Sequence, residues 1–560
     1  MNAVYLAGRG LVSTLGLDVA SAVSAVRSGG VAAVRREVAP EIAWPFQAID
    51  DPDPDWWART QRLVRQAVAE SGALATDRRG PLFLASSSVD IGGRERDGNF
   101  VPGYHHLASC VAEWLDWHGP VFTVSTACTS SSNAVLSASA GIAAGACTHA
   151  LVIGLELENH LTVAGFGAMQ LLSPRDARPL GLDRDGLVLG EAVAALHLSS
   201  TPSRWRVAGG ANVVDGSDPA GAVQSSVATM CHQASARSGV PLAAIDLVKL
   251  QAAGSIGNDA TEAAALHDVF SAMPSLVSLK AMLGHTLGAS GAAEIALLTA
   301  CLEDGAWPSV TGPADPALNV SLAKAPPANA RHVLATILGF GGGHAAVVLE
   351  DTLPTPVIPA KAGTHRPDKQ ADGLTTTASS PLPAQGPGLR RDDARVDLPG
   401  WTCTAHIRLA PPPADWRDTL AKRLGHRPRR LGPWAELALL GARQCLDAAG
   451  EDTLPPDALL RVASWRGADT ATAAALDQCR TGQPMPFTFL QSQPSQMLAA
   501  LSQHLHWQGD ARFLIADDTK HLLALARHEV GPAGLLIGWV EEGAVAGTEA
   551  RSEWWRLIPS

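Results

Sequence analysis

The stretch VSTACTSSSNAVLSASAGIAAGA, from Val124 to Ala146, carries no charged side chain, and the uncharged run extends from Val121 to Leu155. Its length would suffice for a membrane span, since about 20 apolar residues cross a bilayer. Most of its apolar content is Ala and Gly, interspersed with Ser, whereas Leu, Ile and Phe are few. This composition argues against a membrane span and favours a segment that is tightly enclosed within a protein core.

The character of the sequence changes twice within this run. VFTVS is rich in β-branched residues, SSSNAVLSASAGIAAGA has small, helix-compatible side chains, and HALVIGLELE is again typical of a strand. We therefore predict a strand, a turn that holds Cys128, a helix buried on all sides, and a second strand. A cysteine placed just before a buried helix gains from the helix dipole, which favours the thiolate, so Cys128 is a candidate nucleophile. The alternative for any single cysteine is a small buried hydrophobe.

Length and composition indicate a globular chain with more than one unit. Its 560 residues exceed one usual compact domain, and a hydrophobic content of 46% suffices for one large core and a smaller one. The formal net charge of −11 gives no basic footprint, so we expect no nucleic-acid partner. The cysteines are scattered without metal-ligand spacing, and no targeting segment is visible in MNAVYLAGRG. We expect a reduced, cytoplasmic protein without a bound metal or cofactor.

A change of composition divides the chain. Residues 353–398 are rich in Pro, Gly, Thr and Ser and poor in large apolar residues, which predicts a flexible linker. Before it, residues 1–352 alternate strand-like runs with Ala-rich helical stretches, the pattern of an α/β unit with a largely buried sheet. After it, residues 399–560 indicate a second, smaller α/β unit. The runs that carry these predictions are GPLFLASSS, HALVIGLELE, EAVAALHLS, LVKLQAAG and HAAVVLE in the first unit, and WAELALLGARQCLDAAG, ARFLIAD and AGLLIGWVEE in the second.

Four further segments contain residue types suited to acyl-transfer chemistry. SLKAMLGHTLGASGAAE places Lys280 and His285 before a Gly/Ala-rich helix that carries Glu294, and TILGFGGGHAAVVLE places a glycine-rich turn around Phe340. Taken alone, a histidine of this kind is more often structural. With STACTSSSNA, RPLGLDRDGLVLGE and AGSIGNDATEA, however, these segments form an ordered set. The set resembles the β-ketoacyl-acyl carrier protein synthases, the condensing enzymes of fatty-acid and polyketide assembly.

The resemblance covers about residues 1–352 and implies both a fold and a site. The implied fold is the thiolase fold, in which two similar α/β halves stack in five αβαβα layers, normally as a dimer that works with acyl carrier protein. By the same resemblance, Cys128 matches the acyl-accepting nucleophile and His285 matches the second active-site histidine. Lys280 matches the lysine of the family's GH-containing motif, and Glu294 matches the buried acid behind it.

The glycine-rich turn would complete this site. Phe340 matches the family's gate residue and is flanked by Gly339 and Gly341. Backbone N–H groups of Cys128 and Phe340 would form the oxyanion hole. The resemblance thus implies acyl transfer from a carrier thioester to Cys128, followed by condensation with a decarboxylated malonyl thioester.

Several positions depart from the family pattern. Where the family has the first catalytic histidine, in HGTGT, this chain has Gln251, followed by Ala252 and Ala253. A glutamine amide can donate a hydrogen bond, but it cannot supply a positive charge or accept and return a proton at neutral pH. Gly181 and His344 stand where the family has Asp and Asn.

Two functions remain open on these observations. A condensing enzyme with the altered triad Cys128, Gln251 and His285 is favoured by the retained nucleophile. A non-condensing subunit like the chain-length factors, which pair with an active ketosynthase, is favoured by the missing histidine. A thiolase is a distant third, because thiolases need a C-terminal cysteine that GFGGGHA lacks. The expected partners are acyl carrier protein and either a second copy of the chain or another ketosynthase.

The second unit carries a weaker resemblance over about residues 400–545. PMPFTFLQSQPSQMLAAL, around Phe487, is similar to part of a short ketosynthase-like N-terminal domain found beside ketosynthases in clusters for aryl polyene pigments, including the xanthomonadin type. We interpret Gln491, Gln493 and Gln496 within it as a polar turn at a helix start. The resemblance implies a degenerate ketosynthase-like domain with a scaffolding role.

Overall fold

The computed structural model describes residues 2–39, 41–97, 105–218, 221–353, 400–516, 519, 522, 523, 529, 531–543 and 549–560. The predicted linker therefore lies outside the described residues, except for its first residue, Leu353. No helix in the described ranges is long and apolar enough to cross a membrane. Below, the first unit means the described residues up to 353, and the second unit means those from 400 onward.

The elements of the first unit follow the predicted α/β alternation. Its strands are β1 (Tyr5–Ser13), β2 (Val34–Ala39), β3 (Ile42–Gln47), β4 (Leu82–Ala85), β5 (Val121–Val124), β6 (His149–Glu156), β7 (Leu189–Gly190), β8 (Ala192–Ser199), β9 (Trp205–Val214), β10 (Leu247–Lys249), β11 (Ser275–Val277), β12 (His332–Gly339) and β13 (Gly343–Asp351). Its helices are α1 (Val19–Arg27), α2 (Trp56–Glu70), α3 (Ile91–Asp97), α4 (His105–Trp114), α5 (Ser130–Ala143), α6 (His160–Ala168), α7 (Gln224–Ser238), α8 (Ile256–Val269), α9 (Lys280–Leu283) and α10 (Ser290–Asp304).

The second unit is shorter. It consists of β14 (Trp401–Leu409), α11 (Trp416–Leu424), α12 (Pro433–Ala449), β15 (Leu459–Ser464), α13 (Asp469–Arg480), α14 (Pro486–Gln491), α15 (Pro494–His504), β16 (Ala511–Ile515), β17 (Leu535–Glu541) and β18 (Arg551–Pro559). The five strand-like runs of the first unit and the helical run WAELALLGARQCLDAAG contain elements of the predicted type, and the apolar runs ARFLIAD and AGLLIGWVEE contain β16 and β17.

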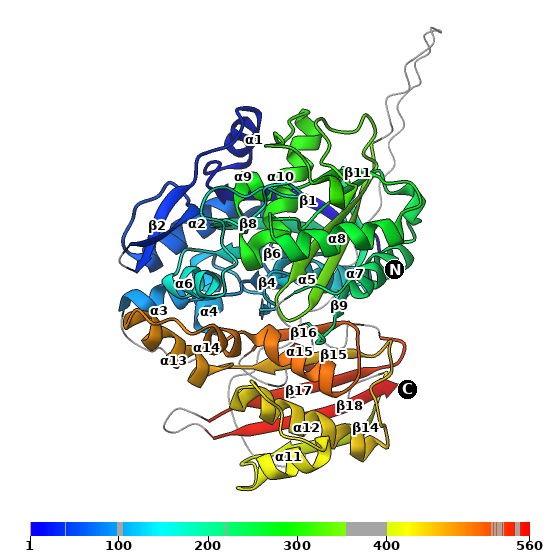
Figure 1. Cartoon of the computed structure of the whole chain (residues 1–560). Helices are drawn as coiled ribbons and strands as arrows, with labels where there is room; N and C mark the ends of the chain where they lie inside the picture. Colours follow the sequence, from blue (N-terminus) through cyan, green and yellow to red (C-terminus); the bar gives the residue numbers. More distant parts are fainter. Residues whose placement is uncertain are drawn as a thin grey trace, which may run out of the picture.

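Two buried helices lie at the centre of the first unit. Helix α5 contacts β4 and β6 on one side and β9 and β13 on the other, and α10 contacts β8 and β12 in the same way. Helices α2 and α4 cover the outer face of one set of strands, and α7, backed by α8, covers the outer face of the other. The result is the five-layer thiolase fold that the resemblance implied (Figure 1).

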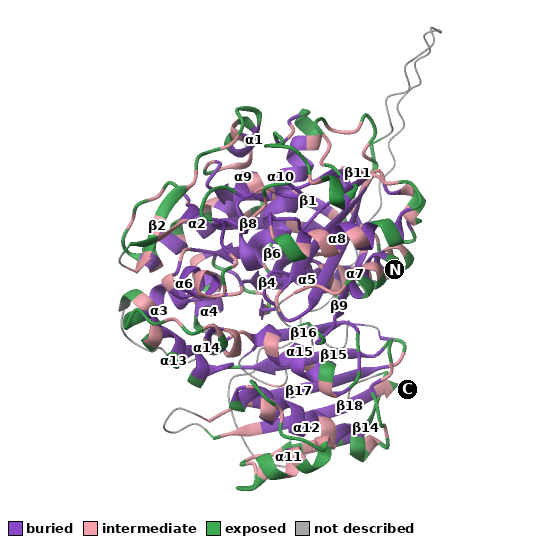
Figure 2. Cartoon of the chain, in the orientation of Figure 1, coloured by how far each residue is buried: buried purple, intermediate pink, exposed green. Residues whose placement is uncertain are grey.

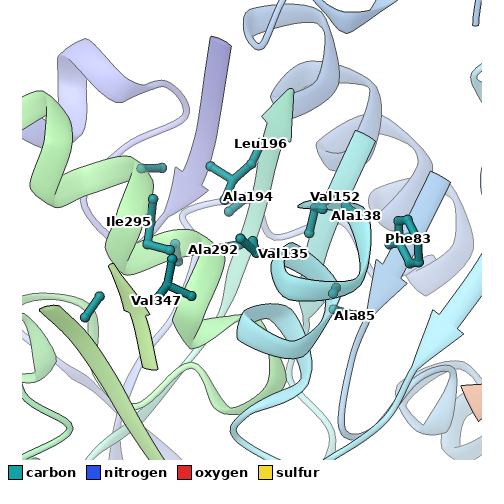
Figure 3. Close-up of a cluster of buried hydrophobic side chains, with 14 of the residues drawn as sticks. Phe83, Ala85, Val135, Ala138, Val152, Ala194, Leu196, Ala292, Ile295 and Val347 are labelled. Carbon is teal, nitrogen blue, oxygen red and sulfur yellow. The ribbon is translucent and has the colours of Figure 1, made fainter. Parts of the chain in front are cut away.

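Small side chains allow this close packing. Figure 3 shows Val135 and Ala138 of α5 and Ala292 and Ile295 of α10 among the strand residues that they contact. The uncharged run from Val121 to Leu155 thus forms the central helix with its two flanking strands. Nine of the fourteen residues of α5 are buried and none is exposed, which explains why its sequence excludes both charge and bulk.

The sheet does not end with the first unit. A single 15-stranded sheet runs in the order β11-β10-β12-β13-β9-β1-β8-β6-β4-β5-β16-β15-β17-β18-β14, and β5 pairs antiparallel with β16. The two largest clusters of buried apolar side chains each contain residues of both units. The contact between the units, which we call the seam, is accordingly buried over much of its length (Figures 1 and 2). The predicted larger and smaller cores are therefore continuous.

Candidate active site

Cys128 lies in a strained turn between β5 and α5. Ala127, just before it, has φ of 52°, in the left-handed region that non-glycine residues seldom adopt. The Ser130 hydroxyl donates to the Ala127 carbonyl at 2.6 Å and accepts from the Thr126 N–H at 2.9 Å, which closes the turn. The side chain of Cys128 is buried at the beginning of the helix, as the sequence predicts.

His285 faces this cysteine. It follows α9, and its backbone N–H donates to the Val188 carbonyl at 2.7 Å. Its Nε2 lies 3.1 Å from the Cys128 Sγ across 157 residues of sequence. The structure thus brings together the predicted nucleophile and the predicted histidine.

Lys280 sets the protonation pattern of this histidine. Its ammonium group contacts His285 Nδ1 at 3.0 Å, Ser290 Oγ at 2.9 Å and the Glu294 carboxylate. An ammonium group has hydrogens to donate and no lone pair, so it can only donate to His285 Nδ1. Because Nδ1 accepts a hydrogen bond, the hydrogen of neutral His285 lies on Nε2, where it points at Cys128.

Sequence analysis missed a second lysine in this network. Lys249, at the end of β10, forms an ion pair with Glu294 and donates to the Thr336 carbonyl at 2.6 Å. Glu294 therefore accepts a hydrogen bond from Lys249 and forms an ion pair with Lys280, and all three side chains are almost fully buried. A lysine in the otherwise apolar run LVKLQAAG was the available signal, since an unpaired buried lysine is rare.

Burial controls the charges of the cysteine and histidine. It raises the pKa of the Cys128 thiol to about 11, although the Lys280 cation and the Phe340 N–H lower that pKa. Burial also lowers the pKa of His285 well below its usual range, and the cations of Lys280 and Lys249 lower it further. Both groups are therefore neutral at rest near pH 7. At Cys128 the loss of hydration outweighs the groups that favour the thiolate.

The glycine-rich turn between β12 and β13 places further donors at the sulfur. Backbone N–H groups of Phe340 and of Cys128 both act on the thiol and lower its pKa. Gly339 lies against Cys128, since a Cβ at Gly339 would be 3.5 Å from the Cys128 Cβ. The Phe340 ring packs edge-on against Phe166, with centroids 5.2 Å apart. The turn thus lies beside Cys128, and the roles of oxyanion donor and gate residue stay predictions.

Gln251 begins a loop that two buried carboxylates hold. Glu262 accepts from the N–H groups of Gln251 and Ala252 at 3.0 and 2.8 Å. Asp259 accepts from the next two N–H groups, at Ala253 and Gly254, both at 3.1 Å. The side-chain oxygen of Gln251 is buried without a hydrogen-bond partner among the described residues. The backbone of this loop is therefore firmly placed by the two carboxylates.

The two other departures differ in their surroundings. His344 is fully buried in β13, neither ring nitrogen has a partner among the described residues, and burial lowers its pKa to about 4. Gly181 lies in a turn, where its N–H donates to the Arg178 carbonyl at 3.0 Å. His344 is thus a neutral core residue near neutral pH.

A small cavity of about 20 Å³ adjoins the cysteine, about the room that one water molecule needs. Gln251 is not among the described residues that line it. Phe489 and Gln493 of the second unit do contribute to its wall, and no sequence motif predicts this contribution. The complete lining is Ser87, Ala127, Cys128, Thr162, Phe166, Leu287, Phe340, Phe489 and Gln493.

Comparison with known families agrees with the geometry of this site. Residues 84–203 match the family model of the beta-ketoacyl synthase N-terminal domain, and residues 206–312 match that of the C-terminal domain. The chain is 30% identical over 276 residues to 3-oxoacyl-[acyl-carrier-protein] synthase 2 of Mycobacterium leprae (strain TN), which covers 44% of this chain and 65% of that protein. The chain thus spans just under two thirds of this curated relative.

Solved structures share the fold. A chain of the complex between the ketosynthase ApeO and its chain length factor ApeC from Xenorhabdus doucetiae superimposes with a TM-score of 0.56 and 24% identity, over 63% of this chain and 98% of that one. A chain described as the PfaC keto synthase-chain length factor covers 100% of this chain, and 78% of its own length is matched, with a TM-score of 0.74 and 13% identity.

Fold and site together define a thiolase-fold protein with a buried cysteine that contacts a buried histidine. Within that class, residues 84–203 and 206–312 match the two domains of the β-ketoacyl synthase family.

Proposed function

We propose that the chain is a β-ketoacyl-acyl carrier protein synthase that condenses acyl and malonyl thioesters. The observation that supports this most directly is the Cys128 Sγ to His285 Nε2 distance of 3.1 Å, with Lys280 fixing the tautomer of the imidazole. A protein with only a structural role would have no need of this buried network around a nucleophile. Fatty-acid or polyketide elongation is the setting we propose, and the aryl polyene pathway stays a prediction.

The first step is acyl transfer. The Cys128 sulfur attacks the carbonyl of an acyl thioester on the carrier protein, a C–S bond forms to Cys128, and the bond to the carrier sulfur breaks. The proton of the Cys128 thiol ends on the departing carrier thiol. N–H groups of Cys128 and Phe340 hold the negative oxygen that develops in the transition state.

The second step forms the carbon–carbon bond. Malonyl thioester loses CO₂, and the resulting carbanion attacks the acyl group on Cys128. The C–S bond to Cys128 breaks and a 3-oxoacyl thioester leaves on the carrier, while one proton from solvent restores the thiol. The Nε2–H of His285 is the donor available to the malonyl carbonyl oxygen. Gln251 can offer an amide N–H but no positive charge.

One observation favours the alternative, a chain-length-factor-like subunit without condensing activity. Gln251 replaces a catalytic histidine, and loss of one oxyanion donor typically costs about 10²- to 10³-fold in rate. The intact Cys128, His285, Lys280 and Glu294 network favours the enzyme. The match over the whole chain to a solved chain described as a keto synthase-chain length factor supports both roles within one polypeptide.

Purified full-length chain, given acyl and malonyl thioesters of an acyl carrier protein, tests this proposal. We expect an acyl adduct on Cys128 by peptide mass spectrometry and a 3-oxoacyl product by liquid chromatography. Cys128→Ala should abolish both, whereas Cys231→Ala, which removes a thiol buried elsewhere in the first unit, should leave both. Product formation at the full rate by Cys128→Ala in a complex with an active ketosynthase would establish the alternative.

A further inference from the structure

The second unit repeats the strand pattern of the first. In chain order, β1, β4, β5, β6 and β8 correspond to β14, β15, β16, β17 and β18. Pairing is antiparallel for β1 with β8 and for β8 with β6, and parallel for β6 with β4 and for β4 with β5. The pairs β14 with β18, β18 with β17, β17 with β15 and β15 with β16 repeat this sequence of directions.

Helices repeat as well. Helix α2 precedes β4 and packs on β1 and β8, and α12 precedes β15 and packs on β14 and β18. Helix α4 precedes and contacts β5, as α15 precedes and contacts β16. Since β5 pairs antiparallel with β16, the two repeats are related by a local twofold axis at the seam.

A buried carboxylate occupies the same place in both repeats. Glu156, at the end of β6, accepts from the backbone N–H groups of Ser87 and Ser88 after β4, at 3.0 and 3.1 Å. Glu541, at the end of β17, accepts from those of Trp465 and Arg466 after β15, at 2.5 and 3.3 Å. A shared capping device of this kind is evidence of repetition that strand order alone would not give.

The repeat lacks the chemistry of the first unit. The sequence between β16 and β17, residues 516–534, contains no cysteine. Within the described residues from 400 onward, there is also no counterpart of β9 to β13, the strands whose following turns carry Gln251 and Phe340. The second unit therefore contains only the half of the fold that forms the seam.

Glycines of the first unit make room for this half. A Cβ at Gly165 would lie 2.6 Å from the Phe489 ring, one at Gly216 would lie 1.9 Å from the Ala499 carbonyl oxygen, and one at Gly341 would lie 2.4 Å from the Ser495 carbonyl oxygen. Ordinary Cβ contacts are longer than about 3.4 Å, so a side chain at any of these positions would separate the units. Gly341 belongs to the turn that holds Phe340, so the seam reaches the site itself.

Buried polar groups also pair across the seam. The Asn212 amide donates to the Ala511 carbonyl at 2.9 Å and to Asp510 at 3.2 Å. Arg512 donates to the Ser137 hydroxyl on α5 at 2.6 Å. These groups have their hydrogen-bond partners only when the units are joined. Separating the units would remove those partners, and a buried polar group without a partner costs free energy.

We infer that residues 400–560 are a non-catalytic half-repeat that takes the place of a partner subunit, so that the chain works as a monomer. Phe489 and Gln493 of this half-repeat close the acyl pocket beside Cys128 and restrict it to short acyl groups. The statement that Phe489 and Gln493 restrict the pocket rests on the proposed function, because it takes the pocket to hold the acyl group. The edge of β5, to which a second copy or another ketosynthase would have to pair by the same contact, is already covered by β16.

The pocket wall explains the restriction to short chains. The rings of Phe340, Phe166 and Phe489 follow one another edge to face, with centroids 5.2 and 5.9 Å apart. Beyond Gln493 lies a second small cavity, which shares Ser87, Thr162 and Gln493 with the cavity at Cys128. Side chains of the second unit thus separate the cysteine from space along the seam.

The mass of the full chain tests the first statement. Size-exclusion chromatography with light scattering should give 58.1 kDa, the mass of one chain. A recognition site for a specific protease, inserted within residues 354–399, should then allow cleavage without a change in that mass. A species of twice the mass before cleavage, or separation of the fragments afterwards, would overturn the inference.

Competing acyl probes test the second statement. Acetyl and octanoyl pantetheine thioesters are offered together, and each adduct on Cys128 is measured by mass spectrometry. Phe489→Ala should raise the octanoyl to acetyl ratio about ten-fold or more, because truncating a buried ring leaves a cavity. Phe487→Ala is the matched control, since Phe487 lies in the same helix, is half exposed and does not line the cavity, and it should leave the ratio unchanged.

Gln493→Ala provides a second opening of the same wall if Phe489→Ala does not fold. An unchanged ratio in the folded variants would overturn the role of this wall. Adduct formation requires neither malonyl thioester nor decarboxylation, so this experiment succeeds or fails independently of condensation.

Discussion

At the scale of single residues, the reactivity of Cys128 depends on a balance between burial and donors. Burial raises the pKa of its thiol to about 11, and the thiolate is the reactive form. Below that pKa, each unit of pH increases the thiolate fraction about ten-fold. Alkylation of Cys128 by iodoacetamide should therefore accelerate about ten-fold per unit from pH 7 to 9, as followed by peptide mass spectrometry. A rate that reaches a plateau near pH 7 would show a thiolate at rest.

Gln251 gives a second prediction at this scale. Transfer to Cys128 needs chiefly the sulfur and its backbone donors, whereas decarboxylation needs donors at the malonyl carbonyl. Gln251→His should therefore raise CO₂ release from malonyl carrier protein by about ten-fold or more, while self-acylation changes by about three-fold at most. Gln251→Ala is the control and should lower CO₂ release. Equal changes in both steps would show that residue 251 acts on the whole pocket rather than on the malonyl group.

Sequence reasoning found the residues that resemble a family and missed those that only packing reveals. Cys128, His285, Lys280, Glu294 and Phe340 were predicted from short motifs and do converge in the structure. Their catalytic roles stay proposals. The missed set, Lys249, Glu156 and Glu262, consists of buried charges whose partners are distant in sequence or are backbone groups. No spacing rule finds such residues. A charged residue within an apolar strand nevertheless indicates a buried charge that needs a partner.

At the scale of elements, the turn between β12 and β13 connects the site to the seam. Gly341 has φ of 81° and meets the Ser495 carbonyl, whereas Gly305, after α10, has φ of 69° and nothing within 4 Å of an added Cβ. Both alanine variants incur the left-handed penalty of about 1–2 kcal/mol. Only Gly341→Ala adds a clash, so it should also slow acylation of Cys128 about ten-fold or more by displacing the Phe340 N–H.

Unfolding by urea and acylation rates measured on both variants check this prediction. Gly305→Ala should lose stability but keep its acylation rate, because its site lies at the end of a helix and away from the turn. Equal acylation rates in the two variants would mean that the turn tolerates displacement, and that the Phe340 N–H contributes little.

Element prediction succeeded where a segment's own residues determine its environment. The small side chains of α5 predict that the helix is enclosed, and the β-branched runs predict their strands. The polar turn predicted for Gln491, Gln493 and Gln496 does lie at the end of α14 and the start of α15. Its contact with the cavity at Cys128 depends on a pairing of β5 with β16, strands that lie nearly 400 residues apart. Local patterns carry no information about such a pairing.

At the scale of the whole molecule, the continuous sheet and shared cores imply one cooperative unit. Calorimetry should show a single unfolding transition, since neither unit can unfold without exposing apolar side chains of the other. Two well-separated transitions would contradict this. They would also weaken the inference that the second unit takes the place of a partner subunit. A unit that is bound only as a separate subunit would be is expected to unfold separately from the first unit.

The charged network at the seam provides the sharpest test of this cooperativity. Asp510 is buried and accepts from Arg461 at 3.2 Å and from Arg512 at 2.8 Å, and despite burial these cations hold its pKa well below the usual range. A lowered pKa adds stability that is fully present above the unfolded value near 4 and is lost only as pH falls toward the folded value, so acid down to about pH 4 should not open the seam. Removing the charge of Asp510 by mutation should open the seam.

Asp510→Asn leaves two buried guanidinium groups short of a partner, which typically costs about 3–5 kcal/mol. Asp418→Asn is the control, because Asp418 pairs with Arg427 on the exposed surface, where ion pairs contribute little. If the molecule unfolds as one, Asp510→Asn should lower a single Tm, and Cys128 in the first unit and Cys445 in the second should become reactive at the same temperature. Exposure of Cys445 well before Cys128 would instead show that the second unit detaches as a separate domain, and that the pocket beside Cys128 survives without it.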